Sequence, residues 1–299
     1  MKILISGASG LVGKHLISTL KAKGNEVHRL VRKTPKSADE IQWNAEKGFS
    51  ETEQTKLEDF DAVIHLAGDN VASENWSDEK KKKIKESRVV GTRVLVDALK
   101  SLQNPPKHFI AASAIGFYGN REAEVLTETS RKGEGFLPDV SAAWEDESKK
   151  AERFARVVCM RIGIVLAKDG GALEKMLTPF KFGVGGTVGS GKQWMSWIAL
   201  DDLIKAVHFF LENENLTGAF NLAAPNPVTN EEFTKTLGTV LNRPTFLPIP
   251  EFAIKTLFGE MGETLLLQGA RVLPKRLQDA GFEFEFNNLE DAMKSVLKK

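Results

Sequence analysis

The sequence contains very little of what extracellular, membrane or metal-binding proteins require. Its 299 residues include one cysteine, Cys159, so neither an intrachain disulfide nor a cysteine-based zinc cage can form. No apolar run approaches the ~20 residues of a membrane helix, and the opening residues MKILISG lack the apolar region of a secretory signal. The five histidines show no metal-ligand spacing. We therefore expect a cytoplasmic protein with no membrane partner and no metal.

Neither sign of charge is in excess. Lys and Arg total 41 and Asp and Glu total 40, which gives a formal charge of +1. A nearly neutral chain gives no electrostatic reason to expect a nucleic-acid partner. The four lysines at residues 80–83 are flanked by acids, which indicates a solvated helix face. The length corresponds to one or two domains with a sizeable core.

Short apolar runs alternate with helical patterns through the first half of the chain. The expected strands are residues 2–6, 26–31, 62–68, 109–113 and 157–162, and the expected helices are residues 11–20, 78–102 and 139–155. This alternation predicts an α/β fold with a Rossmann-type doubly wound parallel sheet and right-handed crossovers.

The pattern changes after Arg161, where glycines crowd a segment that contains Trp194 and Trp197. Short elements follow, with a strand at 219–222 and helices at 200–211, 231–241, 250–258 and 273–280. We assign residues 1–165, joined by 199–224, to a nucleotide-binding domain, and residues 166–198 and 225–299 to a small, mostly helical C-terminal substrate cap. The two tryptophans either line a substrate pocket or belong to the core between the domains.

A glycine-rich turn connects the first strand to the first helix. The residues expected to contact a dinucleotide here are Gly7, Ser9, Gly10, Leu11, Val12 and Gly13. Gly7 permits a tight turn, Gly10 lets a phosphate approach the backbone, and Gly13 lets helix and strand pack closely. The free N–H groups and partial positive charge of a helix N-terminus suit a pyrophosphate. Because strand, helix and next strand lie where the motif requires them, we predict dinucleotide binding.

The end of the second strand selects the dinucleotide. An acid at this position accepts hydrogen bonds from the ribose hydroxyls of NAD, but here Val31 is followed by Arg32 and Lys33. A guanidinium offers bidentate contact to a 2′-phosphate. We therefore expect NADP(H) rather than NAD(H), with Val31, Arg32 and Lys33 near the adenosine.

At this point the chain resembles the extended short-chain dehydrogenase/reductases, which include nucleotide-sugar epimerases and dehydratases. Within that family it is similar to an atypical branch of proteins called epimerase family proteins. The matching blocks are 7–13, 65–68, 91–92, 113–118, 169–173, 189–194, 197–203 and 272–277, which span nearly the whole chain. In the block at 197–203, Ala199 stands where relatives usually have histidine.

The resemblance implies further contacts to the cofactor. Leu66 and Ala67, followed by Gly68, would line the ribose on the nicotinamide side, and Val165 would approach the carboxamide. Arg88 stands where sugar epimerases usually carry asparagine, and it would pair with a phosphate or with acids on its own helix. The family also implies a homodimer through the long helices.

The family's proton relay, Tyr-x-x-x-Lys on the helix after the fifth strand, is absent. The chain has one tyrosine, Tyr118, and Glu122 rather than lysine follows it by four residues. Hydride transfer at a C–OH group needs a base for the hydroxyl proton. Ser113 and Tyr118 are the candidate catalytic residues, with Ser113 either holding a substrate oxygen or bonding to backbone at the strand end.

Three interpretations stay open. Tyr118 transfers the proton; or an acid or water chain does so, with Glu128 or Asp139 nearest; or the fold keeps NADP(H) without ordinary dehydrogenase chemistry. We predict an NADP(H)-binding oxidoreductase or epimerase-like protein that acts on a small molecule. A nucleotide-sugar is one candidate substrate. The alternative is a non-catalytic NADP(H)-binding regulatory or interaction protein. His65, inside an apolar strand, is expected to be a core residue.

Overall fold

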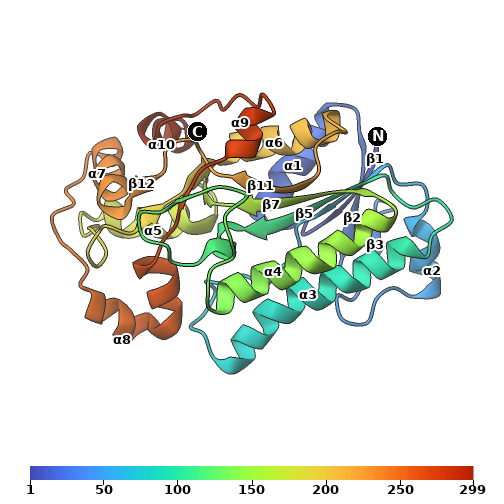
Figure 1. Ribbon diagram of the computed structural model, residues 1–299, viewed down its shortest axis with the longest axis horizontal. Helices are drawn as coiled ribbons and strands as arrows, with labels where there is room; N and C mark the ends of the chain where they lie inside the picture. The colour runs from blue at the N-terminus through green and yellow to red at the C-terminus, as the bar shows by residue number, and fades with distance from the viewer. Residues whose placement is uncertain (299) are drawn as a thin grey trace.

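The computed structural model describes residues 1–298, and a parallel sheet runs through its centre (Figure 1). Its strands lie in the order β11-β7-β5-β4-β1-β2-β3, and every neighbouring pair is parallel. Their bounds are β1 Lys2–Ser6, β2 Glu26–Val31, β3 Glu40–Gln42, β4 Ala62–His65, β5 His108–Ala114, β7 Arg156–Ile162 and β11 Gly218–Leu222. Strand order reverses at β1, so ligands are expected beyond the carboxyl ends of β1 and β4. The predicted Rossmann-type sheet is confirmed.

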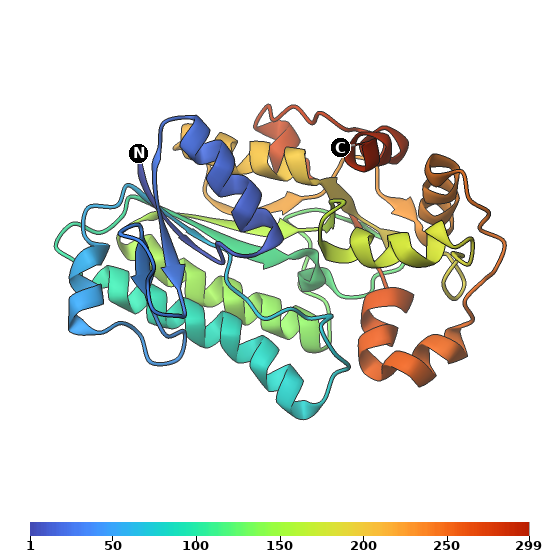
Figure 2. The same ribbon diagram turned by 180° about the vertical axis from the view of Figure 1, so that it is seen from behind.

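Helices cover both faces of this sheet, which Figures 1 and 2 show from opposite sides. One face carries α1 (Leu11–Ala22) and α6 (Leu200–Glu212), and the other carries α3 (Asp78–Lys100), α4 (Phe136–Lys149) and the short α2 (Glu51–Gln54). In β1, Ile3 and Ile5 join the core beneath α1 and α6, while Leu4 joins the core beneath α3. Because both faces are buried, the strands are continuous apolar runs rather than alternating ones.

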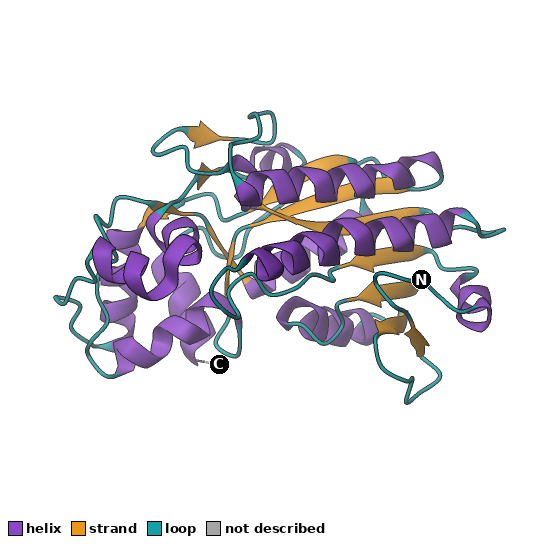
Figure 3. Ribbon diagram, turned by 90° about the horizontal axis from the view of Figure 1, so that it is seen from below, coloured by secondary structure: helices purple, strands orange, loops and turns teal. Residues whose placement is uncertain are grey.

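The C-terminal half adds short strand pairs and helices beyond one end of the sheet (Figure 3). The strand pairs are β8 (Ile164–Leu166) with β10 (Trp197–Ala199), β9 (Trp194–Met195) with β12 (Val228–Thr229), and β6 (Val125–Leu126) with β13 (Arg271–Val272). The helices are α5 (Gly171–Lys181), α7 (Asn230–Leu241), α8 (Glu251–Gly262), α9 (Lys275–Asp279) and α10 (Leu289–Lys298). A separate hydrophobic core joins α5, α7 and α10 around Trp197 and Phe233. Trp197 is therefore a core residue, and its indole N–H donates to the Asn226 carbonyl at 3.1 Å.

The expected elements are present, and the differences have local causes. The apolar run at 62–68 ends as a strand at His65, so residues 66–68 form a loop at the carboxyl edge. α4 begins at Phe136, earlier than expected, because Gly135 adopts a φ of 110° and turns the chain into the helix. α5 was not expected, because Gly170, Gly171 and Pro179 resemble loop residues. In residues 1–298, no helix is both long and apolar enough to cross a bilayer.

Candidate functional site

The turn from β1 into α1 presents unpaired backbone N–H groups. Gly10 is the N-cap of α1, no side chain caps the helix, and no acid lies in its first turn. The first N–H bonded back along the helix is that of Lys14, to the Gly10 carbonyl at 3.0 Å. The Gly10 N–H donates to the Gly7 carbonyl at 3.0 Å, which leaves the N–H groups of residues 11–13 for a ligand. The helix dipole favours an anion there. Ser9 and Gly10 are exposed, while Leu11 and Val12 are half-buried.

Two of the glycines are required by contact. Gly7 has a φ of 72°, and a Cβ there would lie 2.7 Å from the carbonyl carbon of Leu66. A Cβ on Gly13 would lie 2.4 Å from the Gly7 carbonyl oxygen. A side chain on Gly7 would push the turn away from the residues that follow β4, and one on Gly13 would push it away from α1. The two glycines therefore allow the turn to pack closely against both elements.

A buried hydrogen-bond chain fixes the loop after β4 from below. The Ser6 hydroxyl accepts from the backbone N–H groups of Leu66 and Ala67 at 3.1 and 3.2 Å, and it bonds Nδ1 of His65 at 2.6 Å. Nε2 of His65 reaches the Thr92 hydroxyl at 2.9 Å. Burial lowers the pKa of His65 to about 4, so the ring is neutral. His65 is thus a satisfied core residue that positions Leu66 and Ala67.

In the loop after β2, the carboxylate of Asp39 is paired, whereas, in the part of the chain that the structure describes, the side chains of Arg32 and Lys33 are not. Arg29 binds both carboxylate oxygens of Asp39, at 3.1 and 3.2 Å. The Ser37 hydroxyl and then Arg29 lower the pKa of Asp39 to about 2, against its partial burial. Arg32 and Lys33 are exposed and take part in no hydrogen bond or ion pair in residues 1–298. The end of β2 therefore offers cations rather than an acid to an adenosine ribose.

The other predicted cofactor contacts lie along the same carboxyl edge. Val31, Leu66, Ala67 and Val165 are half-buried and Gly68 is exposed. The guanidinium of Arg88, from α3, lies over Gly68: a Cβ there would be 3.1 Å from Cζ of Arg88. The Arg88 guanidinium also stacks on the Trp144 ring of α4, 5.1 Å from its centroid. The alternative that Arg88 pairs with acids on its own helix is not observed.

Ser113 is buried and already committed to a carboxylate. Its hydroxyl donates to Oε1 of Glu145 at 2.7 Å. Arg161 binds the same carboxylate with two N–H groups, Nε to Oε1 at 2.7 Å and Nη2 to Oε2 at 2.8 Å. Glu145 stands four residues after Ser141 on the face of α4 that meets β5 and the one-turn helix η2 (Ile115–Tyr118). At these two positions, four residues apart, α4 thus carries a buried serine and a buried glutamate rather than a tyrosine and a lysine.

Tyr118 is fully buried, and its hydroxyl is taken up by protein groups. The one-turn helix η2 (Ile115–Tyr118) directs it into a small core with β6 and β13. Its hydroxyl donates toward Oδ1 of Asn221 at 2.7 Å, lies 3.0 Å from the Thr127 carbonyl, and accepts from Nη1 of Arg161 at 2.9 Å. Burial raises its pKa, with Arg161 opposing the shift. This geometry argues against Tyr118 as the proton donor and gives it a structural role.

The two acids considered as substitutes also have structural partners. Glu128 accepts from the backbone N–H groups of Asn221 and Arg276, at 3.0 and 3.3 Å. Asp139 is exposed and pairs with Lys132. Neither carboxylate lies among the residues of the Ser113–Glu145 cluster.

Comparison with known proteins gives this site its context. A profile described as the NAD dependent epimerase/dehydratase family matches residues 3–141, and one described as a domain of unknown function, DUF1731, matches residues 249–296. An epimerase family protein of Mycobacterium leprae is 40% identical over 97% of this chain and 94% of its own. The chain belongs to this epimerase family.

Solved structures agree with the family. Human epimerase family protein SDR39U1, crystallised with NADPH, matches with a TM-score of 0.91 and 31% identity over 100% of this chain and 99% of its own. A nucleoside-diphosphate sugar epimerase from Corynebacterium glutamicum matches with a TM-score of 0.81 and 31% identity over 99% of this chain and 58% of its own. The predicted family is thereby confirmed.

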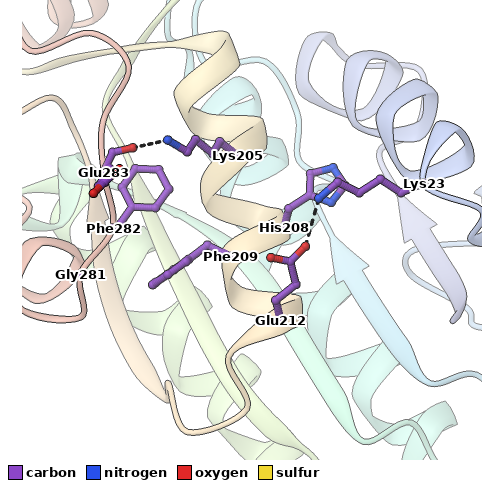
Figure 4. Close-up of a pocket in the computed structure, with 8 residues that line it drawn as sticks. All are labelled: Lys23, Lys205, His208, Phe209, Glu212, Gly281, Phe282 and Glu283. Atoms are coloured by element: carbon purple, nitrogen blue, oxygen red, sulfur yellow. Dashed lines mark hydrogen bonds and ion pairs between the residues drawn. The ribbon is translucent and has the colours of Figure 1, made fainter.

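Sequence reasoning missed Glu145, Arg161 and Trp144 in this epimerase family chain. One signal was available: Arg161 interrupts the apolar run of β7, and a charged residue in a buried strand requires a partner. The distinct pocket in Figure 4, about 300 Å³, is not part of this site. Lys23 and Glu212 form an ion pair at 3.0 Å in this pocket. Lys23 directly follows the C-terminus of α1, whereas Gly10 lies at the N-terminus of that helix, and Glu212 is the last residue of α6.

Proposed function

We propose that this protein binds NADP(H) at the carboxyl edge of the sheet and acts as an epimerase-like oxidoreductase on a small molecule. The observation that carries the proposal is the uncapped N-terminus of α1 beside a free Arg32. The turn supplies N–H donors for the pyrophosphate, and Arg32 with Lys33 supplies charge for a 2′-phosphate. The NADPH of the human relative supports this choice of cofactor.

The chain's own groups fit a dinucleotide in an extended pose along this edge. Gly7 and Gly13 let the turn pack closely against β4 and α1, Leu66 and Ala67 are held rigid from below, and Arg88 stands over Gly68. When bound, the nicotinamide supplies a hydride. A rigid, half-buried wall would orient its ring and exclude water from one side.

The small molecule carries anionic oxygen in this proposal. Arg271 has no hydrogen-bond partner in residues 1–298, and its Nε is buried. Its guanidinium lies over the Trp194 ring at 4.4 Å from the centroid. An unpaired arginine stacked on an aromatic ring suits phosphate or carboxylate, and a nucleotide-sugar is one such molecule.

The proton in such a reaction does not come from Tyr118, which is buried and hydrogen-bonded elsewhere. The remaining hydroxyl is that of Ser113, whose bond to Glu145 lets the carboxylate accept its proton. Arg161 orients Glu145 through two hydrogen bonds. The proposed relay is therefore Ser113 with Glu145, held by Arg161.

The first experiment is a titration of nucleotide-free protein with NADPH and with NADH, read as energy transfer from tryptophan to the reduced nicotinamide. We expect tighter binding of NADPH than of NADH, and loss of that preference in Arg32→Ala. Lys47→Ala, which removes an exposed cation elsewhere on the surface, is the matched control. No binding of either nucleotide would refute the proposal.

A second candidate function follows from the absence of Tyr-x-x-x-Lys: a non-catalytic protein that binds NADP(H) and engages a partner. A screen of keto compounds, which can accept a hydride from NADPH, with NADPH-loaded protein separates the two. Oxidation of the nicotinamide that Ser113→Ala abolishes supports the enzyme. No turnover, together with a set of captured proteins that changes with NADPH, supports the regulator. The cytoplasmic location and the homodimer stay proposals of the same kind.

A further inference from the structure

α4 carries a buried indole whose N–H has no partner. Trp144 is 5% exposed, and its Nε1 makes no hydrogen bond in residues 1–298. The indole N–H groups of Trp76 and Trp197 are bonded to the carbonyls of Val71 and Asn226, at 2.8 and 3.1 Å. Buried donors are almost always paired in folded proteins, so an unpaired one beside a ligand site points to a ligand acceptor.

The Arg88 guanidinium, stacked on this indole, also has spare donors. Within residues 1–298 its one hydrogen bond runs from Nη1 to the Ile84 carbonyl at 3.1 Å. Burial lowers the pKa of Arg88 to about 10, which leaves it cationic at neutral pH. Asp69 acts on it electrostatically but is bonded elsewhere, to the Lys80 ammonium.

Lys80 corrects the expectation that residues 80–83 form a solvated face. Its side chain is 2% exposed and binds both Asp69 and the Ser73 hydroxyl, the latter at 2.7 Å. The adjacent carboxylate is therefore neutralised by a buried lysine rather than by Arg88. This arrangement leaves the charge of Arg88 available for a bound anion.

The Arg88 guanidinium and the Trp144 indole lie next to the proposed nucleotide site. Arg88 lies against Gly68, which follows the Leu66 backbone that packs against Gly7. We propose that Arg88 and Trp144 together bind an anionic oxygen of the phosphate or carboxylate class at this edge of the sheet. The proposal rests in part on the proposed nucleotide site, because the dinucleotide's diphosphate is one source of such an oxygen. A small anionic substrate is the other.

The test follows the indole N–H resonances of ¹⁵N-labelled protein while NADPH or inorganic pyrophosphate is added. Trp144→Phe assigns the resonance and removes the donor while keeping an aromatic ring over Arg88. Arg88→Met removes the cation and keeps the aliphatic stem. Trp76→Phe is the matched control, because the Trp76 N–H already has a partner in Val71. We expect a downfield shift of the Trp144 resonance and a Kd for NADPH about tenfold higher in Trp144→Phe and higher still in Arg88→Met.

The outcomes separate this inference from the proposed function. A shift with NADPH and weaker NADPH binding in both variants identifies the cofactor as the source. A shift with pyrophosphate alone, in protein that binds no NADPH, supports the anion site and refutes the cofactor proposal. NADPH binding with no shift and no change in either variant overturns the anion site and leaves the cofactor proposal standing. Equal weakening in Trp76→Phe also overturns it, because the effect would then not depend on the unpaired N–H.

Discussion

Replacing Glu145 by glutamine would leave a buried arginine without its counter-charge. Glu145 and Arg161 side chains are 1% and 6% exposed and share two hydrogen bonds, and Ser113 adds a third to the same carboxylate. Glu145→Gln keeps the shape, but its amide NH₂ would face an Arg161 N–H. Removing one partner of a buried ion pair costs about 3–5 kcal/mol. That is a large part of the roughly 5–15 kcal/mol that stabilises an ordinary domain.

Urea unfolding followed by circular dichroism measures this loss. With a slope of about 3 kcal/mol per molar urea, the midpoint should fall by about 1–1.7 M at unchanged slope. The control is Asp279→Asn, which breaks the Lys275–Asp279 pair; its N–O distance is a similar 2.9 Å, but both side chains are about 60% exposed. That pair is worth about 0.3–0.5 kcal/mol. Equal midpoint shifts in the two variants would refute the argument that burial makes the Glu145–Arg161 pair essential.

Three further predictions concern the core and the turn. The pKa of His65 is about 4 in the folded state against 6.5 in a free side chain, so below pH 6.5 the unfolded state takes up the proton first. Stability should fall by on the order of 3 kcal/mol between pH 6.5 and 4, and His65→Gln should flatten that part of a urea-midpoint profile; an unchanged profile would exclude His65 as the cause. In Gly13→Ala the added Cβ would lie 2.4 Å from the Gly7 oxygen, so this variant should lose NADPH binding in the energy-transfer titration. Gly24→Ala is the control: no atom lies within 4 Å of its Cβ, and it should only destabilise the protein by about 1 kcal/mol. Tyr118→Phe should cost about 1–3 kcal/mol in thermal or urea unfolding and leave the Kd for NADPH unchanged; weaker NADPH binding at unchanged stability would return Tyr118 to the site.

Most of the sheet was predictable because strands that are buried on both faces have continuous apolar sequences. β1 and β2 have the predicted bounds, and the glycine turn between them lies where the motif requires. β3 was not predicted, since its three residues, Glu40–Gln42, are two-thirds polar and it lies at the sheet edge. α5 was missed because glycine and proline are typical of loops, whereas here Gly170 and Gly171 stand at the start of the helix and Pro179 lies inside it.

The candidate site was less predictable, because its decisive contacts join residues far apart in sequence. The absence of a tyrosine from α4 was visible in the sequence, but the contact between Arg161 of β7 and Glu145 of α4 was not, because the two residues come from different elements. Tyr118 illustrates the limit: its position after β5 predicted that it lies near the ligand edge, and a single turn of 3₁₀ helix directs its ring into a small core, where its hydroxyl bonds Asn221 and Arg161. Sequence position fixes where a backbone enters the site, whereas side-chain direction is set by which buried groups need a partner. Here the hydroxyl of Tyr118 bonds Asn221 and Arg161, which is why the relay that we propose uses Ser113 and Glu145 instead.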